Sequence, residues 1–282
     1  MDFLQWLRVV VLGIVEGVTE WLPVSSTGHL IILNEFWKGD PTVFTDAFTT
    51  LFDVIIQLGA ILAVVTVFFH KLNPISTYKT KEQKKNTWSL WGKVLVAVIP
   101  AVIAGLFLDD IMDQYLYNAY VVGGALIFYG IAFIVVERIF RDRDPSVMKF
   151  SRLSFKTAFF IGLFQVLALV PGTSRSGATI IGALILGCSR YIATEFTFYL
   201  AIPVMLGASV LKAVKYFFVE HQSVSGTQAL VLFVACAVAY GVSMFIINFL
   251  IRFVKRHDFT GFGIYRIVLG IAVIVIFAAV LH

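Results

Sequence analysis

The chain has 282 residues, of which 59% are hydrophobic and only 14% are charged. Soluble domains contain about 25% charged residues, so this composition excludes an ordinary soluble protein and indicates an integral membrane protein. The net charge is +5 at pH 7, and the basic residues are distributed among several connections between apolar segments, which excludes a nucleic-acid-binding patch. Both cysteines, Cys188 and Cys236, lie in apolar stretches, so we expect buried thiols and no disulfide framework.

The first apolar stretch, 3–37, is interrupted near its middle by Trp21–His29 (WLPVSSTGH). Proline, glycine and hydroxyl residues of this kind break a helix. Each half is too short to cross about 30 Å of hydrocarbon. We therefore expect a re-entrant helical hairpin, which a membrane tolerates only where protein or a polar cavity covers the irregular backbone.

Six later segments each have about 20 mostly apolar residues, the length that a spanning helix needs. In chain order they are 48–69, 90–108, 119–137, 196–218, 229–249 and 263–281. Between the third and the fourth, the stretch 155–188 is interrupted by Pro171–Gly177 (PGTSRSG) and predicts a second re-entrant hairpin. The expected fold is all-α, with six transmembrane helices and two re-entrant hairpins in one membrane domain, 1–282.

Basic residues are concentrated in alternate connections. Most of the 22 Lys and Arg lie in 70–93, 138–156 and 252–256, whereas 109–118 and 219–226 contain none. The positive-inside rule therefore places the three basic segments in the cytoplasm and both chain termini outside. With this topology the first hairpin enters the membrane from outside and the second enters from the cytoplasm.

The two hairpins also have similar sequences. Gly13–Glu16 followed by Pro23–Gly28 resembles Gly162–Gln165 followed by Pro171–Gly177. Together with their opposite orientation, this similarity predicts an inverted-topology repeat, an architecture that builds sites at the bilayer midplane from broken helices. The expected repeats cover about 1–138 and about 155–282.

Ionisable side chains in both hairpins indicate a polar site inside the membrane, because each costs at least a few kcal/mol at that depth. The first hairpin contains Glu16, Glu20 and His29, and the second contains Arg175. Glu16 and Glu20 share one helix face, so a cation, a shared proton or Arg175 is expected to compensate their charges. The alternative interpretation is a structural charge cluster that joins the two hairpin tips.

The residues that follow each break favour a bound anion such as phosphate. A new half-helix begins there, and its free N–H groups bind phosphate well. Several hydroxyl residues lie at these points, namely Ser25, Ser26, Thr27, Ser174 and Ser176. Any one of them is more often a helix cap than a reactive group. Ser26 differs because His29 follows three residues later, where an imidazole can act as base or acid toward the hydroxyl.

Two long motifs resemble a known family. Glu16–His29 (EGVTEWLPVSSTGH) and Pro171–Thr179 (PGTSRSGAT) are similar to the signature motifs of the bacterial undecaprenyl-diphosphate phosphatases, the bacitracin-resistance family. The similarity extends over nearly the whole chain. It implies removal of one phosphate from the C55 lipid undecaprenyl diphosphate, which recycles this carrier lipid for peptidoglycan synthesis and confers bacitracin resistance.

The resemblance also implies a location and a set of site residues. The active site is expected to open to the outer face of the bacterial plasma membrane. The implied residues are Glu16, Glu20, Ser26, Thr27, His29, Ser174, Arg175 and Thr179, to which the hairpin sequences add Ser25 and Ser176. We expect Ser26 to attack with His29 as proton acceptor, and the motif leaves His29 as the alternative nucleophile. Glu16 and Glu20 would orient His29 or hold Mg²⁺ or Ca²⁺, because these ions prefer oxygen ligands.

A transporter or flippase for phosphorylated polyprenyl lipids is the main alternative, because inverted repeats with broken helices are typical of transporters. The hydroxyl, imidazole and carboxylate groups at the hairpin tips favour an enzyme. The expected partners are a polyprenyl pyrophosphate and the bilayer, without nucleic acid, and a homodimer is compatible with the sequence. Packing ion pairs or contacts behind the site are expected of Asp53, Arg190, Glu195 and Arg266.

Overall fold

A computed structural model describes residues 1–116 and 118–280, and this part of the chain contains helices and no β-strand. Six described helices are long and apolar enough to cross a membrane: Asp46–Val67 (α3), Lys81–Leu108 within α5 (Lys81–Leu116), Ala119–Ile139 (α6), Arg190–Val219 (α9, Arg190–Val214, with the π-helical turn η3), Gly226–Phe253 (α10) and Thr260–Ala279 within α11 (Thr260–Val280). The predicted fold class and six spans are confirmed. Residue 281, the predicted end of the last span, lies outside the described residues.

Polar N-cap residues start most of these helices. Each cap side chain accepts a hydrogen bond from a backbone N–H that has no partner within the helix. The capping residues outside the broken stretches are Asp2, Thr45, Asn118, Ser154, Ser189 and Ser225. The helix starts are therefore fixed by local sequence, even where the helix itself is apolar on all sides.

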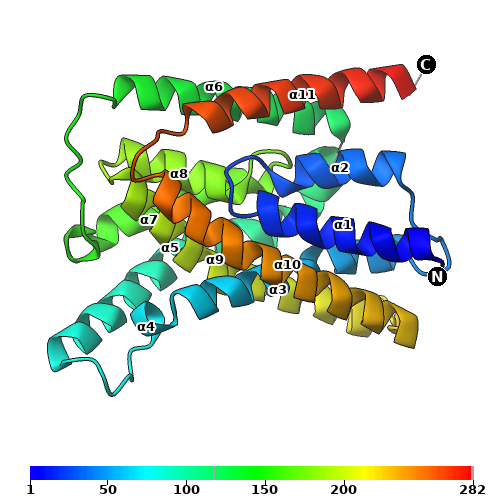
Figure 1. Cartoon of the computed structure of the whole chain (residues 1–282), viewed down its shortest axis with the longest axis horizontal. Coiled ribbons are helices and arrows are strands. Elements are labelled where there is room, and N and C mark those ends of the chain that lie inside the picture. The colour runs from blue at the N-terminus through cyan, green and yellow to red at the C-terminus, as the bar shows by residue number, and fades with distance from the viewer. Residues whose placement is uncertain (117, 281–282) are drawn as a thin grey trace.

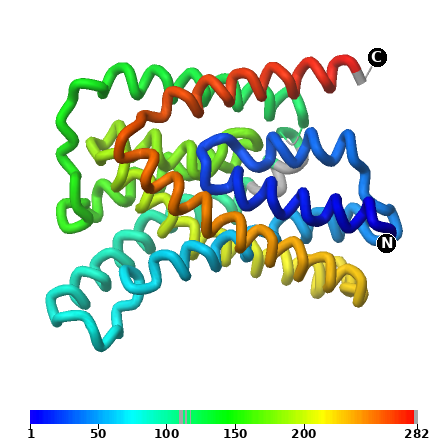
Figure 2. The backbone as a smooth tube through the Cα atoms, viewed as in Figure 1, coloured from blue at the N-terminus to red at the C-terminus, as the bar shows by residue number. Residues whose placement is uncertain are grey.

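The two interrupted stretches form pairs of short helices. The first pair is α1 (Phe3–Thr19) and α2 (Ser26–Phe36), and the second is α7 (Phe155–Val166) and α8 (Arg175–Ile185). An 11-residue helix is about 17 Å long, so α2 and α8 cannot cross a bilayer alone. The chain reverses inside the molecule after α1 and returns to the end from which it came (Figures 1 and 2). Re-entry of these hairpins into a bilayer stays a prediction.

Both termini lie at one end of the molecule (Figure 1). The short helix α4 (Phe69–Leu72), the connection from α6 to α7 and the connection from α10 to α11 lie at the opposite end. These connections carry the three basic segments. The structure therefore gathers at one end the charges that the positive-inside rule assigns to one side of the membrane.

This topology predicts that Gln83, in the first basic segment, faces the cytoplasm. We expect Gln83→Cys, in a background with Cys188 and Cys236 replaced by alanine, to resist an impermeant thiol reagent in intact cells. The matched control is the exposed His221, in the connection before α10 at the end that holds both termini. We expect His221→Cys to be labelled in intact cells. Labelling of Gln83→Cys in intact cells would reverse the topology.

Helices α6 and α11 cross through a motif that occurs in both. Gly123 and Gly130 of α6 are followed by isoleucines at the same spacing as Gly263 and Gly270 of α11. A Cβ added at Gly130 would lie 2.7 Å from the carbonyl oxygen of Gly263, and the same distance holds in reverse. Gly123 meets Gly270 in the same way. The contact is therefore symmetric, with residue n of α6 matching residue n + 140 of α11.

Each hairpin also packs against a helix of the other half. Gly13 of α1 approaches the carbonyl oxygen of Ala235 in α10, and Gly162 of α7 approaches that of Ala97 in α5. In both cases the first helix of a hairpin contacts the second spanning helix of the other half. The division into inverted repeats over about 1–138 and 155–282 stays a prediction, and these matched contacts support it.

Candidate functional site

The two turns adopt the same unusual backbone conformation. Ser25 and Ser174 are the N-caps of α2 and α8, and their φ values are +72° and +67°. The Ser25 Oγ accepts from the N–H of Gly28 at 3.5 Å, and the Ser174 Oγ accepts from the N–H of Gly177 at 3.2 Å. A positive φ in a residue other than glycine costs about 1–3 kcal/mol and is typical of functional sites. The capping role considered for the hydroxyls is confirmed at these two serines.

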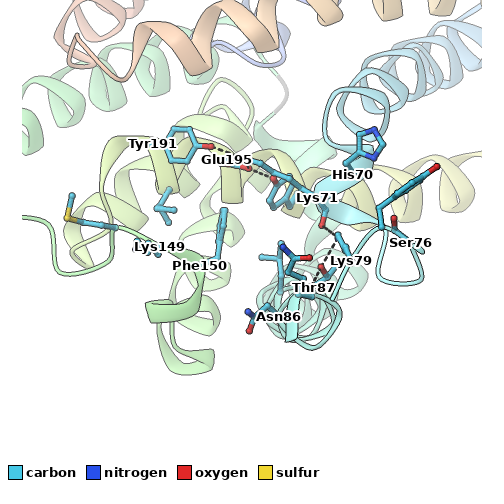
Figure 3. A pocket seen from close by; sticks show the side chains of 16 residues that line it. His70, Lys71, Ser76, Lys79, Asn86, Thr87, Lys149, Phe150, Tyr191 and Glu195 are labelled. Atoms are coloured by element: carbon cyan, nitrogen blue, oxygen red, sulfur yellow. Dashed lines mark hydrogen bonds and ion pairs between the residues drawn. The ribbon is translucent and has the colours of Figure 1, made fainter. Parts of the chain in front are cut away.

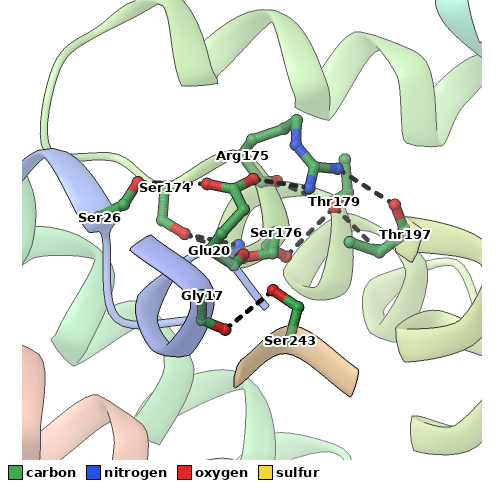
Figure 4. Close-up of polar contacts among 10 residues, drawn as sticks. Gly17, Glu20, Ser26, Ser174, Arg175, Ser176, Thr179, Thr197 and Ser243 are labelled. Carbon is green, nitrogen blue, oxygen red and sulfur yellow. Dashed lines mark hydrogen bonds and ion pairs between the residues drawn. The ribbon is translucent and has the colours of Figure 1, made fainter. Parts of the chain in front are cut away.

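Glu20 joins the two hairpins (Figure 4). Its Oε1 accepts a hydrogen bond from Nη2 of Arg175 at 3.0 Å, and the two side chains are 9% and 12% exposed. Its Oε2 accepts from the Oγ of Ser26 at 3.2 Å. Arg175 also donates to the carbonyl oxygen of Thr197 in α9 at 3.1 Å. The predicted compensation of Glu20 by Arg175 is therefore confirmed, and one carboxylate contacts both a cation and a hydroxyl.

Glu16 lies one helical turn before Glu20 and is fully buried. Neither of its carboxylate oxygens has a hydrogen-bond partner among the described residues. Because a buried carboxylate without a partner is costly, Glu16 fits a site that is completed by a proton, a cation or a ligand. The described residues contain no group of three His, Cys, Asp or Glu side chains placed to hold a metal.

His29 forms no hydrogen bond with Ser26 in the structure, which differs from the predicted serine–histidine pair. Its Nδ1 lies 2.7 Å from the carbonyl oxygen of Ser25, and its Nε2 lies 2.7 Å from the hydroxyl of Tyr265. A carbonyl oxygen only accepts, so Nδ1 donates and Nε2 of the neutral ring accepts from Tyr265. The Tyr265 ring also stacks on the imidazole. The reason is geometric: α2 turns the imidazole toward α11, whereas Glu20 lies beside the hydroxyl.

Two of the remaining predicted hydroxyls, those of Ser176 and Thr179, have partners within the protein. Ser176 is buried and donates to the backbone oxygen of Glu20 at 3.2 Å, which ties α8 to the first turn. Thr179 is fully buried, and its hydroxyl contacts the hydroxyl of Thr197 at 2.8 Å and the backbone oxygen of Arg175 at 2.9 Å. Thr27 is half-buried in the first turn of α2. Ser176 and Thr179 thus support the backbone around Glu20 and Arg175.

Two of the predicted packing ion pairs are present. Arg190 binds Glu137 through Nε and Nη2, with the closest oxygen at 2.5 Å. Glu195 binds Lys71 at 2.7 Å. Among the described residues Arg266 forms no ion pair and binds backbone oxygens instead. Asp53 forms no ion pair within 4 Å of a described cation, although the charge of Arg8 acts on its carboxylate, so its packing role stays a prediction.

A cavity of about 690 Å³ opens at the basic end, away from the hairpin turns (Figure 3). Its polar groups bind one another. Lys71 contacts Glu195 and the hydroxyl of Tyr191, and Lys79 donates to two backbone oxygens and to Thr87. The predicted site residues Glu20, Ser26 and Arg175 are not part of its lining. The hydroxyl, carboxylate and guanidinium that meet at the hairpin turns are therefore separate from this cavity.

Sequence reasoning missed Tyr265 and the site contacts of Arg266. Both lie on α11, far from the first hairpin in the sequence, and nothing in their local sequence points to a site. The matched spacing of glycine and isoleucine in α6 and α11 is the signal that could have found them. It aligns Arg266 with Leu126, so that an arginine stands where the other half has an apolar residue.

The fold and the site define an all-helical membrane protein in which two broken helices bring together a hydroxyl, carboxylates and an arginine suited to a phosphate group. The chain belongs to the family described as bacitracin resistance protein BacA, whose model matches residues 9–272. It is also similar to curated relatives that carry the name undecaprenyl-diphosphatase. Three examples come from Streptococcus thermophilus (53% identity, 96% of this chain and 93% of the relative), Lactiplantibacillus plantarum (53%, 96% and 97%) and Lactococcus lactis subsp. cremoris (54%, 99% and 98%).

Proposed function

We propose that this protein hydrolyses undecaprenyl diphosphate to undecaprenyl phosphate and inorganic phosphate, at a site that opens to the outer face of the bacterial plasma membrane. The names of the relatives and the family match support this activity. The structural observation that carries it is the carboxylate of Glu20, which contacts both Ser26 and Arg175. A carrier needs cations and N–H groups to hold a phosphate, but it has no need of a hydroxyl paired with a carboxylate.

Substrate binding is assigned to Arg175 and the starts of α2 and α8. An arginine presents parallel N–H groups that match two phosphate oxygens. The N–H groups at the starts of the two half-helices provide further donors and a favourable dipole. When the diphosphate binds, Arg175 exchanges the Glu20 oxygen for phosphate oxygens. This exchange frees the carboxylate next to Ser26.

Ser26 then attacks the terminal phosphorus, and its proton passes to Glu20. The bond between this phosphorus and the bridging oxygen breaks, and its electron pair leaves with the lipid monophosphate. Water next attacks the phosphoserine, and the bond between phosphorus and the Ser26 oxygen breaks. Glu20 returns its proton to this oxygen, and phosphate leaves with the oxygen and both protons of the water. Arg175 and the N–H groups stabilise the charge that spreads over the phosphate oxygens during both steps. His29, held by Ser25 and Tyr265, fixes the start of α2 in this scheme.

A divalent cation, Mg²⁺ or Ca²⁺, fits this proposal if Glu16 is its protein ligand, because both oxygens of Glu16 lack partners among the described residues. Mg²⁺ is commonly held by one or two carboxylates together with substrate phosphates. When bound, the ion would neutralise charge on the phosphate oxygens. All the proposed side chains come from one chain, so a homodimer is not required for the chemistry.

The proposal is tested by measuring phosphate release from C55 diphosphate by the purified protein in detergent, with and without a chelator. We expect release in both the native protein and a chelator-treated sample re-supplied with Mg²⁺ or Ca²⁺, and loss of most turnover when the chelator alone is present. Turnover that a chelator leaves unchanged would remove the cation from the proposal. Absence of phosphate release, with transport of labelled lipid phosphate in proteoliposomes, would favour the transporter.

A further inference from the structure

One buried arginine contacts both turns of the site. Arg266 of α11 is fully buried. Its Nη1 donates to the carbonyl oxygen of Pro23, in the first turn, at 3.2 Å. Its Nη2 donates to the carbonyl oxygens of Gly172 and Thr173, in the second turn, at 2.9 and 2.8 Å. The turn carbonyls lie outside the helical hydrogen bonds, so this side chain satisfies three of them.

The second turn is also held from the other side. Gly172 has a φ of +88°, which glycine adopts without strain, and a Cβ here would lie 2.6 Å from the carbonyl oxygen of Val122 in α6. The turn therefore lies between α6 and the guanidinium of α11. The first turn is in contact with the same guanidinium, so the distance between the two turns depends on Arg266.

The other half of the chain shows that the fold does not need an arginine here. The α6–α11 motif matches Arg266 with Leu126. A Cβ at Gly177 of α8 would lie 3.0 Å from Nη1 of Arg266, and a Cβ at Gly28 of α2 would lie 3.0 Å from Cδ1 of Leu126. The same packing contact is thus made by leucine in one half and by arginine in the other. Packing alone does not explain a buried charge that has no carboxylate partner among the described residues.

We propose that Arg266 is a positioning residue that fixes the two turns at the relative position that catalysis requires. Resting on the proposed hydrolysis, this assignment explains how Ser26 and Glu20, on the first hairpin, stay aligned with Arg175 on the second. Arg266 itself is buried against backbone oxygens and does not touch the reacting groups. Misplacement of reacting groups by about 1 Å lowers rates by about 10²-fold, so a small shift between the turns is enough to slow turnover by this factor.

The test compares Arg266→Leu and Arg266→Lys with the native protein in the phosphate-release assay, together with their thermal unfolding. Because leucine occupies the matched position in the other half, Arg266→Leu is expected to fold. We expect its kcat to fall about 10²-fold while KM stays within about threefold. Arg266→Lys should recover about tenfold of this loss, since an ammonium group donates to carbonyls but cannot span both turns equally. The matched control is Lys93→Leu, which removes another buried cation that donates to a backbone oxygen, that of Phe150.

Each other outcome contradicts the assignment. A raised KM with native kcat would make Arg266 a substrate-binding group. Native kcat and KM in Arg266→Leu would make it a packing residue. If Arg266→Leu does not fold, the kcat and KM of Arg266→Lys decide between the same outcomes.

A second measurement does not depend on activity. It therefore distinguishes a failure of the positioning role from a failure of the proposed hydrolysis. Spin labels at Phe36→Cys and Ile185→Cys, exposed near the far ends of α2 and α8, report the separation of the hairpins. The native cysteines are replaced by alanine for this measurement. We expect Arg266→Leu to broaden or shift the distance distribution, and an unchanged distribution would overturn the assignment. A native protein that releases no phosphate would overturn the proposed function alone.

Discussion

Arg175→Lys is expected to lower kcat/KM by about 10²–10³-fold, although the positive charge is kept. The guanidinium can bind two phosphate oxygens with parallel N–H groups, whereas an ammonium group acts as a point charge. Arg175 also donates to the carbonyl oxygen of Thr197 while it binds Glu20, and the shorter lysine cannot make both contacts from the same backbone position. The measurement is steady-state phosphate release over a range of substrate concentrations.

The matched control for this substitution is Arg190→Lys. Arg190 also binds a carboxylate, that of Glu137, through two nitrogens, but it lies outside the hairpin turns. We expect nearly native turnover in this control. Native turnover in Arg175→Lys itself would reduce Arg175 to a general counter-ion for Glu20.

Ser26→Ala is expected to lose about 10³-fold or more in kcat, the scale of effect when a nucleophile is removed. The reason is that Ser26 donates its hydroxyl hydrogen to Glu20, which can take up this proton during attack. Ser209→Ala is the control, because it removes a buried serine hydroxyl of α9 that donates to the carbonyl oxygen of Val54, away from the site. Both variants are compared with the native protein in single-turnover experiments.

The alternative nucleophile is His29, and its contacts argue against it. Its Nδ1 donates to Ser25, and its Nε2 accepts from Tyr265, so neither nitrogen is free in the structure. We expect His29→Ala to retain measurable turnover and the trapped phosphoenzyme to survive acid. An acid-labile adduct, with Ser26→Ala active and His29→Ala inactive, would reverse the assignment. Loss of only a few fold in Ser26→Ala, without any covalent adduct, would instead indicate direct attack by water.

The sequence by itself determined the class of protein, the six spans and the two interruptions. These features depend on local properties: the length of apolar stretches, the backbone limits of proline and glycine, and the side chains that cap helices. The grouping of Glu16 and Glu20 on one face also follows from helical spacing alone. Compensation of Glu20 by Arg175 was predicted because the two hairpin motifs suggested that their tips meet.

Only the tertiary structure decided which groups contact one another at the tips. The three-residue spacing of Ser26 and His29 suggested a direct pair, but spacing along a helix leaves open which neighbouring helix lies beside each side chain. Glu20 accepts from Ser26, and Tyr265 holds His29, because α1 and α11 approach α2 from different sides. The role of Arg266 depends in the same way on packing between segments far apart in the sequence. Such contacts are set by the relative position of whole helices, which local sequence does not determine.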